Sequence, residues 1–156
     1  YQVRRKNYFL GHWMRYGGWY HHHLCVFRRR GARYDGLVHE RLTVDGPVGV
    51  LDADLEHYPF ESVTQFIDRQ NRYTSLQAEE LWQRRGRLPD REIRYQMRIK
   101  PLKLFWKFYV KKQAFRDGVH GLVFSWLYAW VHLLIWAKYW ERCLAHPPER
   151  PHDDTP

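Results

Sequence analysis

The most regular pattern of apolar and polar positions lies in residues 60–89 and has helical spacing. Ser62 followed by Gln65 fits a capping box at its start, and Gly86 with Pro89 is typical of a helix end. The pattern therefore predicts one long helix, within a unit 59–100 made of a helix and a linker. The residues on its expected packing face are Val63, Phe66, Ile67 and Gln70.

Two more helical segments follow in residues 101–141. The first opens at Lys100 and Pro101, and its lysines recur every four residues, which is typical of a helix on an anionic membrane or on a partner. The second, residues 118–137, has no Asp, Glu, Lys or Arg, so a helix of about 30 Å would match a hydrocarbon core. Because its Trp and Tyr side chains prefer the headgroup level, we expect shallow insertion or packing and not a full span. The first helix is expected to place Leu102, Phe105, Trp106 and Tyr109 opposite Lys103, Lys107 and Lys111.

The N-terminal part, residues 1–58, predicts loops and strands. Residues 1–19 are basic, aromatic and interrupted by glycines, which indicates loop and a short helix. The apolar run 24–27 predicts a short buried strand, and apolar residues on both sides of Asp45 and Gly46 predict a hairpin over residues 42–51. The expected fold class is α+β, and residues 142–156 are expected to form a disordered tail.

Net charge and aromatic content indicate which classes of partner the chain could bind. The 156 residues carry a formal net charge of +9, which favours an anionic partner such as nucleic acid, a phosphorylated substrate or anionic lipid. Aromatic residues make up 17% of the chain, which fits sugar stacking or a membrane interface as well as a core. Cys25 and Cys143 lie far apart, so a reducing compartment is expected. We also expect the chain to be part of a longer protein without a signal peptide at Tyr1.

Three histidines and an arginine run raise two candidate sites. His21, His23 and Cys25 would share one side of a strand and could bind Zn²⁺, but the usual helical or knuckle spacings are absent. We therefore prefer a polar loop that ends in a strand, with no metal there. The arginine run at Arg28, Arg29 and Arg30 could follow a phosphate backbone, yet no nucleic-acid motif accompanies it, so nucleic acid is not the expected partner.

Carboxylate side chains give two further candidate sites, one for a metal ion and one for a general base. Asp52 and Asp54 resemble the D-x-D pair that holds Mg²⁺ or Mn²⁺ against a nucleotide sugar, but this pair is common by chance. We interpret it as two solvated acids at a hairpin exit. Glu40, beside His39, could instead deprotonate a hydroxyl group from the edge of an element.

Seven segments taken in order resemble one family. They look like the C-terminal half of the bacterial lipopolysaccharide-core beta-1,4-glucosyltransferases, which are family 2 enzymes with the GT-A fold. The resemblance runs from about Arg4 to Glu141. It departs from the family at His21–His22–His23, where members commonly have Pro-Asp. The segments are RRKNYFLGHWMRYGGWY, FRR, VHERLTVDGPVG, LEHY, NRYTSLQAEE, KPLKLFWKFYVKKQAFRDGVHGL and YAWVHLLIWAKYWE.

The resemblance implies an inverting transfer of a hexose, with glucose as the expected sugar, from a nucleotide sugar to a lipopolysaccharide-core or related lipid-linked acceptor. It implies that the nucleotide-binding loop and the true D-x-D precede this chain, and that they hold most of the bonds to Mg²⁺ or Mn²⁺. Such an enzyme would lie on the cytoplasmic face of the bacterial inner membrane, as a peripheral or monotopic protein. By this resemblance Glu40 is the base, Trp19 stacks on a sugar, and Arg28, Arg29, His39 and His57 bind substrate. The alternative is a non-catalytic basic adaptor for a membrane surface or nucleic acid.

Overall fold

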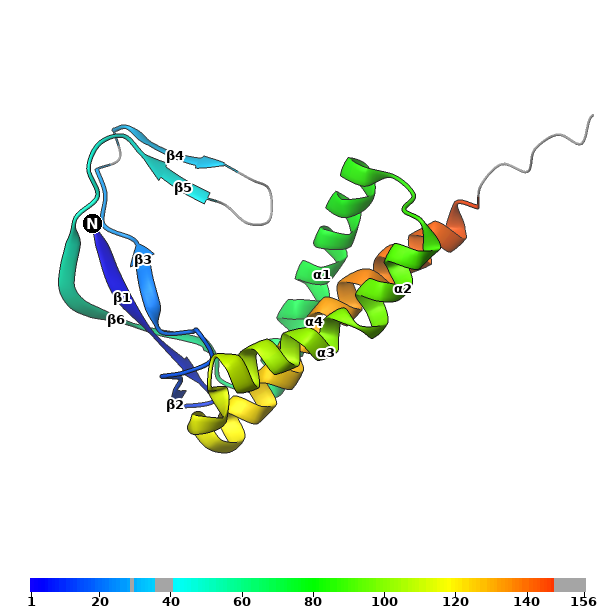
Figure 1. Cartoon of the computed structure of the whole chain (residues 1–156). Helices are drawn as coiled ribbons and strands as arrows, with labels where there is room; N and C mark the ends of the chain where they lie inside the picture. The colour runs from blue at the N-terminus through cyan, green and yellow to red at the C-terminus, as the bar shows by residue number, and fades with distance from the viewer. Residues whose placement is uncertain (29, 36–40, 148–156) are drawn as a thin grey trace, which may run out of the picture.

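The computed structural model describes residues 1–28, 30–35 and 41–147, and it shows a mixed α+β fold with a sheet arm and a helix arm (Figure 1). The strands are β1 (Gln2–Phe9), β2 (His12–Trp13), β3 (His21–Leu24), β4 (Ala32–Asp35), β5 (Arg41–Val44) and β6 (Val50–Phe60). The helices are α1 (Val63–Arg85), α2 (Asp90–Arg98), α3 (Lys100–Trp106), a π-helical turn (Lys107–Lys111), a 3₁₀ turn (Ala114–Asp117) and α4 (Gly118–Ala145). The α+β expectation is therefore confirmed at this level.

Strand β1 is the centre of the main sheet. Strand β6 pairs with it in parallel along one side, and β3 and β2 pair with it antiparallel along the other side. In this register Arg5 lies opposite His21 and Leu55, and Asn7 lies opposite His57. Because side chains alternate along a strand, Arg5, Asn7 and His57 point to the same face of the sheet.

Three predictions about the N-terminal part are wrong. Residues 1–19 contain β1 and β2 and no helix, and the strand expected at 24–27 lies earlier, at β3. The 42–51 hairpin does not form, because β5 pairs with β4 and β6 pairs with the distant β1. Asp45 N–H donates to the Gly31 carbonyl at 3.0 Å and so closes the β4–β5 ladder before Gly46. The turn-forming sequence at Gly46 therefore belongs to a connection and not to a hairpin.

The long predicted helix is confirmed as α1. Ser62 Oγ accepts a hydrogen bond from Gln65 N–H at 3.0 Å, and Gly86 ends the helix with a φ of 56°. The predicted linker is wrong in part, because α2 fills most of it. The first turn of α2 is acidic at Asp90 and Glu92, which suits a helix N-terminus. The predicted tail also begins too early, since α4 continues to Ala145.

Two clusters of aromatic and aliphatic side chains form the core, and the first of them joins the two arms. The first packs the end of the sheet against α1 and α4, and the second packs α1, α2 and α4 against one another. The first cluster consists of Phe9, Met14, Phe60, Phe66 and Phe124, and the second of Ala78, Leu88, Ile93, Trp136, Tyr139 and Cys143.

The described chain has one helical stretch, Ala114–Ala145, that is long and apolar enough to cross a membrane by length and composition, a criterion that core helices also meet.

Candidate functional site

A groove of about 580 Å³ lies where the two arms meet, between α1, α3 and α4. Arg5 of β1 lines it from the sheet, and aromatic and amide side chains line it from the helices. None of the lining residues is a carboxylic acid. These residues are Arg5, Gln70, Tyr73, Gln77, Leu104, Phe108, Tyr128, Val131, His132 and Ile135.

The sheet side of the groove is organised by Asn7. Its side-chain oxygen accepts a hydrogen bond from Arg5 Nε at 3.2 Å and lies 2.8 Å from His57 Nδ1. Its amide nitrogen donates to the Trp19 carbonyl, which fixes the orientation of the amide. An oxygen at this position can only accept, so His57 Nδ1 carries the proton and Nε2 is the basic nitrogen of the neutral ring.

Cations surround His57. Burial lowers its pKa, and the charges of Arg5, Arg69 and His23 lower it further. The Arg69 guanidinium reaches this region from α1, where it lies 5.3 Å from the Phe60 ring and donates to the Pro59 carbonyl at 3.2 Å. Of these side chains Arg5 lines the groove, and the others lie beside His57. Positive charge in and next to a groove whose lining has no carboxylate favours an anionic ligand.

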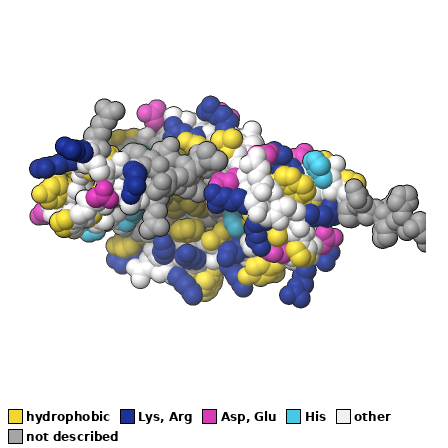
Figure 2. All heavy atoms as spheres, turned by 90° about the horizontal axis from the view of Figure 1, so that it is seen from above, with side chains coloured by type: hydrophobic (Ala, Val, Ile, Leu, Met, Phe, Trp, Pro, Cys, Tyr) yellow, Lys and Arg dark blue, Asp and Glu magenta, His cyan; other side chains and the backbone are white. Residues whose placement is uncertain are grey.

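The helix side of the groove offers polar groups on a rigid frame. Tyr128 OH accepts a hydrogen bond from Trp19 Nε1 at 3.4 Å. His132 Nε2 lies 3.1 Å from Gln96 Oε1, and burial followed by the charge of Lys100 lowers the pKa of His132. Figure 2 looks onto the open side between the arms and shows Lys and Arg side chains on both of them.

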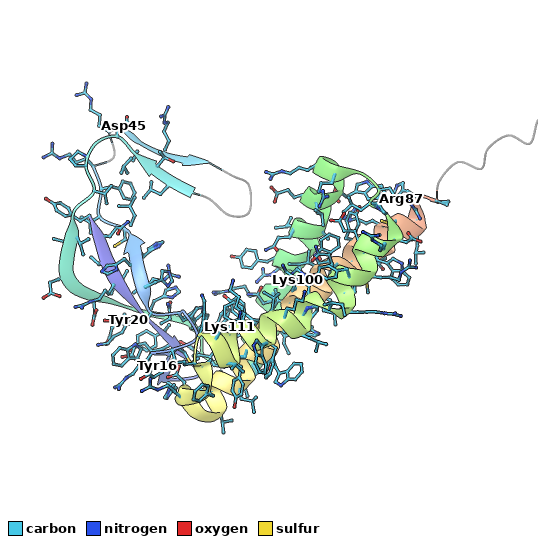
Figure 3. All side chains as sticks on the ribbon, in the orientation of Figure 1. Tyr16, Tyr20, Asp45, Arg87, Lys100 and Lys111 are labelled. Atoms are coloured by element: carbon cyan, nitrogen blue, oxygen red, sulfur yellow. The ribbon has the colours of Figure 1, made fainter. Side chains whose placement is uncertain are left out.

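The structure brings some of the sequence-predicted residues to this groove and leaves others away from it. His57 does not line the groove, but it lies 2.8 Å from the Asn7 oxygen that also accepts a hydrogen bond from the lining residue Arg5. Trp19 is half-buried in the aromatic cluster, with its ring centroid 4.1 Å from that of Phe124, and its indole N–H donates to Tyr128 OH, which lines the groove. Arg28 lines a different hollow with Asp45, and Figure 3 shows Asp45 at the end of the sheet arm far from the helices. Arg29, His39 and Glu40 lie outside the described residues.

Asp52 and Asp54 are ion-pair partners in the middle of β6 and not acids at a hairpin exit. Arg4 donates to Asp52 at 2.7 Å and to Asp54 at 3.1 Å, and Lys6 lies 3.5 Å from Asp54. Burial opposes ionisation of Asp54, but the hydrogen bond from Tyr20 and the charges of Arg4 and Lys6 outweigh it and lower its pKa. Because Arg4 and Arg5 are adjacent on β1, this cluster lies on the face of the sheet opposite the groove.

Metal binding has little support in the described part of the chain. Residues 1–28, 30–35 and 41–147 contain no group of three or more His, Cys, Asp or Glu side chains that could hold a metal ion. In the sheet, His22 lies opposite Arg4 and His21 opposite Arg5, so the histidine run is paired with a basic strand.

Sequence reasoning missed Arg5, Asn7, Arg69 and Tyr128. Arg5 and Asn7 are two residues apart, which would place them on one side of a strand, but the run of charges around them hides a strand pattern. Their meeting with His57 depends on the parallel pairing of β1 with β6, which no local signal predicts.

The histidines predict a loss of stability in mild acid. The pKa values of His23, His57 and His132 are lowered from 6.5 in the folded chain, mainly by burial, so the unfolded chain binds more protons below that pH. The free energy of unfolding should be highest above about pH 7, where the rings are neutral in both states. It should fall as the pH drops through 6.5 and the unfolded chain takes up protons. Urea unfolding at a series of pH values measures this, and His57→Gln should flatten the dependence. Stability that rises between about pH 7 and pH 5.5 would contradict the burial of these rings.

Comparison with known proteins adds no assignment. No protein-family model matches the chain, and no solved structure matches it. The residues of the groove and the sequence motifs are thus what bears on function.

Proposed function

We propose that the chain is the acceptor-side part of an inverting glycosyltransferase that moves a hexose from a nucleotide sugar to a lipid-linked saccharide. The proposal is supported by the resemblance of its motifs to the lipopolysaccharide-core glucosyltransferases. The observation that carries it is the carboxylate-free groove lined by Arg5, which shares the Asn7 side-chain oxygen with His57, while the charge of Arg69 acts on the same imidazole. The proposed place of action is the cytoplasmic face of the bacterial inner membrane, where such an acceptor is found.

The groove suits a phosphorylated substrate. Two guanidinium groups can each donate a pair of hydrogen bonds to phosphate oxygens, and a nearby imidazole can add a third donor when it is protonated. Such a substrate is either the diphosphate of the donor or a phosphate on the acceptor lipid. Tyr73 and Tyr128 provide aromatic and hydroxyl surfaces that suit a sugar ring beside that phosphate.

The residues of the groove do not fit the divalent cation that the family uses. Mg²⁺ and Mn²⁺ prefer carboxylate and carbonyl oxygens, whereas the charged side chains around His57 are cationic. Asp52 and Asp54 are paired with Arg4 on the other face of the sheet. We therefore assign no step of the reaction in this chain to a metal.

The proposed base is Glu40. It would take the proton of the acceptor hydroxyl group while the oxygen attacks the anomeric carbon and the diphosphate leaves from the opposite side. Glu40 directly precedes β5 in the sequence, and Figure 1 shows the β4–β5 hairpin projecting from the sheet arm across the open side of the molecule towards α1.

Binding of diphosphate tests the groove without requiring a complete active site. Arg5→Gln combined with Arg69→Gln should weaken binding of inorganic diphosphate by at least about tenfold, because two charge-assisted hydrogen bonds are lost. Isothermal titration calorimetry at low salt measures the dissociation constant. Arg72→Gln on the exposed side of α1 is the matched control and should change it by less than about twofold, since a lone exposed charge is screened.

Two results would count against the proposal. Equal weakening by Arg72→Gln would indicate a diffuse effect of net charge and not a site. Tight, salt-sensitive binding of a nucleic-acid duplex that depends on Arg5 and Arg69, with no transfer of labelled hexose from a nucleotide sugar to a lipid-linked acceptor, would favour the adaptor function instead.

A further inference from the structure

We propose that the exposed side of α3, together with Trp126 of α4, is a docking surface that lies flat in the headgroup layer of an anionic membrane. This docking face consists of Ile99, Leu102, Trp106 and Trp126, bordered by Lys103, Lys107 and Lys111. The inference rests on the membrane location in the proposed function, but its residues are separate from the diphosphate groove.

Helix α3 and the π-helical turn that follows it are apolar on two sides. Pro101 and Leu104 of α3 and Phe108 of the turn face the protein, since Pro101 is buried and the other two line the groove. The other side still exposes 57% of Leu102, 57% of Trp106 and 44% of Ile99 to solvent. A helix that served only the core would carry polar residues at these positions.

The lysines share the exposed side with these apolar residues. Ile99, Leu102, Lys103, Trp106, Lys107 and Lys111 line one shallow hollow of about 650 Å³. The sequence-based expectation that Leu102 and Trp106 lie opposite the lysines is therefore wrong. Lysines next to exposed Leu and Trp are typical of interfacial helices, because their long stems cover apolar surface while their ammonium groups reach the headgroups.

Helix α4 continues the apolar surface. The Trp126 ring stacks on Phe105 with a centroid separation of 4.3 Å, yet half of Trp126 remains exposed. The exposed Val119 and Leu122 precede it in α4 at helical spacing, so they lie on the same side of the helix. Phe115, in the preceding 3₁₀ turn, is also exposed.

The positive charge of this region favours an anionic membrane as the binding partner of the docking face. Residues 99–116 contain five lysines and one arginine and no carboxylate. Figure 3 labels Lys100 at the start of α3 and Lys111 at the end of the π-helical turn. Anionic phospholipids attract such a segment, and tryptophan prefers the headgroup level. A second copy of this basic segment would meet it with like charge.

Contacts on the other side of α4 argue against a full span. Lys138 donates to Asn71 and Ser75 of α1 at 2.7 Å, and Trp136 and Tyr139 are buried against the same layer. Glu79 of α1 forms an ion pair with Arg142 of α4. Moving α4 across a bilayer would carry the charged surface of α1 into hydrocarbon, so the helices lie along the membrane.

Flotation with preformed vesicles tests the docking face. The whole chain should float with vesicles of phosphatidylglycerol and phosphatidylcholine, and much less with phosphatidylcholine alone. Leu102→Ser with Trp106→Ser should lower partitioning by more than about tenfold, and Lys103→Gln with Lys107→Gln by about thirtyfold at low salt. The control Leu76→Ser changes a leucine of α1 that is 55% exposed and should have no effect.

The outcomes separate the alternatives. Release of the bound chain by alkaline carbonate supports docking on the surface, whereas retention would show a span and overturn the inference. Equal loss with Leu76→Ser, or binding that is the same on neutral vesicles, would also overturn it. If the chain does not float and the Leu102 and Trp106 variants abolish a dimer in sedimentation, the face binds a second copy and the inference is overturned. Diphosphate binding should be unchanged in all of these variants. Failure of the proposed diphosphate site can therefore be distinguished from failure of the docking face.

Discussion

Replacing Glu40 with glutamine should lower hexose transfer by about 10²–10⁴-fold, which is the usual cost of losing a general base. Glutamine keeps the size of the side chain but cannot accept the proton of the attacking hydroxyl group. Binding of the nucleotide sugar should be retained, because the proton moves only during the reaction. The loss should therefore appear in kcat and not in KM.

Asp52→Asn and Asp54→Asn are the comparison for Glu40→Gln. Both acids lie on the face of the sheet that carries Arg4, and the Asp52 side chain is 95% exposed. Exposed ion pairs contribute little to stability, so each substitution should change transfer by at most about fivefold. This expectation separates the base at Glu40 from the D-x-D motif, which is the more obvious candidate in the sequence.

Transfer of radiolabelled hexose to a lipid-linked acceptor, in the longest natural form of the protein that contains this chain, measures all three variants. Full activity of Glu40→Gln together with inactive Asp52→Asn and Asp54→Asn would invert the assignment and place the chemistry on β6. Loss in all three variants with normal unfolding would show that both segments belong to one site.

The helices were largely predictable from the sequence because their signals are local. The cap at Ser62, the end at Gly86 and the start at Lys100 each depend on residues within one or two turns. The helix α2 was missed although Pro89, Asp90 and Glu92 form a reasonable N-terminus, since its many charges weaken the apolar pattern.

The sheet and the groove were not predictable in the same way. Strand β1 reads Gln-Val-Arg-Arg-Lys-Asn-Tyr-Phe, and only Val3, Asn7 and Phe9 in it are buried, so its alternation is hidden among cations. Its partner β6 lies about fifty residues away in sequence, and the preference for a local hairpin at Gly46 was the stronger signal. His57 was identified by resemblance, whereas its neighbours Arg5 and Arg69 required the fold.

Gly121→Ala should destabilise the fold by about 3 kcal/mol, although alanine normally favours a helix by about 1 kcal/mol over glycine. Gly121 is buried on the first turns of α4, where a Cβ atom would lie 1.7 Å from the Ala114 carbonyl oxygen and 2.6 Å from its carbon. A backbone carbonyl cannot rotate away as a side chain can, so the 3₁₀ turn would have to move.

The 3₁₀ turn Ala114–Asp117 holds in place the loop of the sheet arm that contains Arg15, Tyr16 and Gly17. Asp117 is buried and accepts hydrogen bonds from the backbone of Arg15 at 3.3 Å and of Tyr16 at 2.9 Å. Gly17 N–H donates to the Lys112 carbonyl at 2.8 Å on the same side. Displacing the turn would therefore leave a buried carboxylate short of donors and would loosen the junction of the two arms, which forms the groove.

Urea unfolding measures the effect, with Gly11→Ala as the control. Gly11 has a φ of 77°, and a Cβ added there would meet no atom within 4 Å, so its substitution costs only the left-handed backbone strain of about 1 kcal/mol. Gly121→Ala should lower the midpoint clearly more than Gly11→Ala, and it should also weaken diphosphate binding because the arms shift at the groove. A stabilising Gly121→Ala would mean that α4 and the Ala114 turn do not approach each other this closely, and the junction would then not depend on their contact.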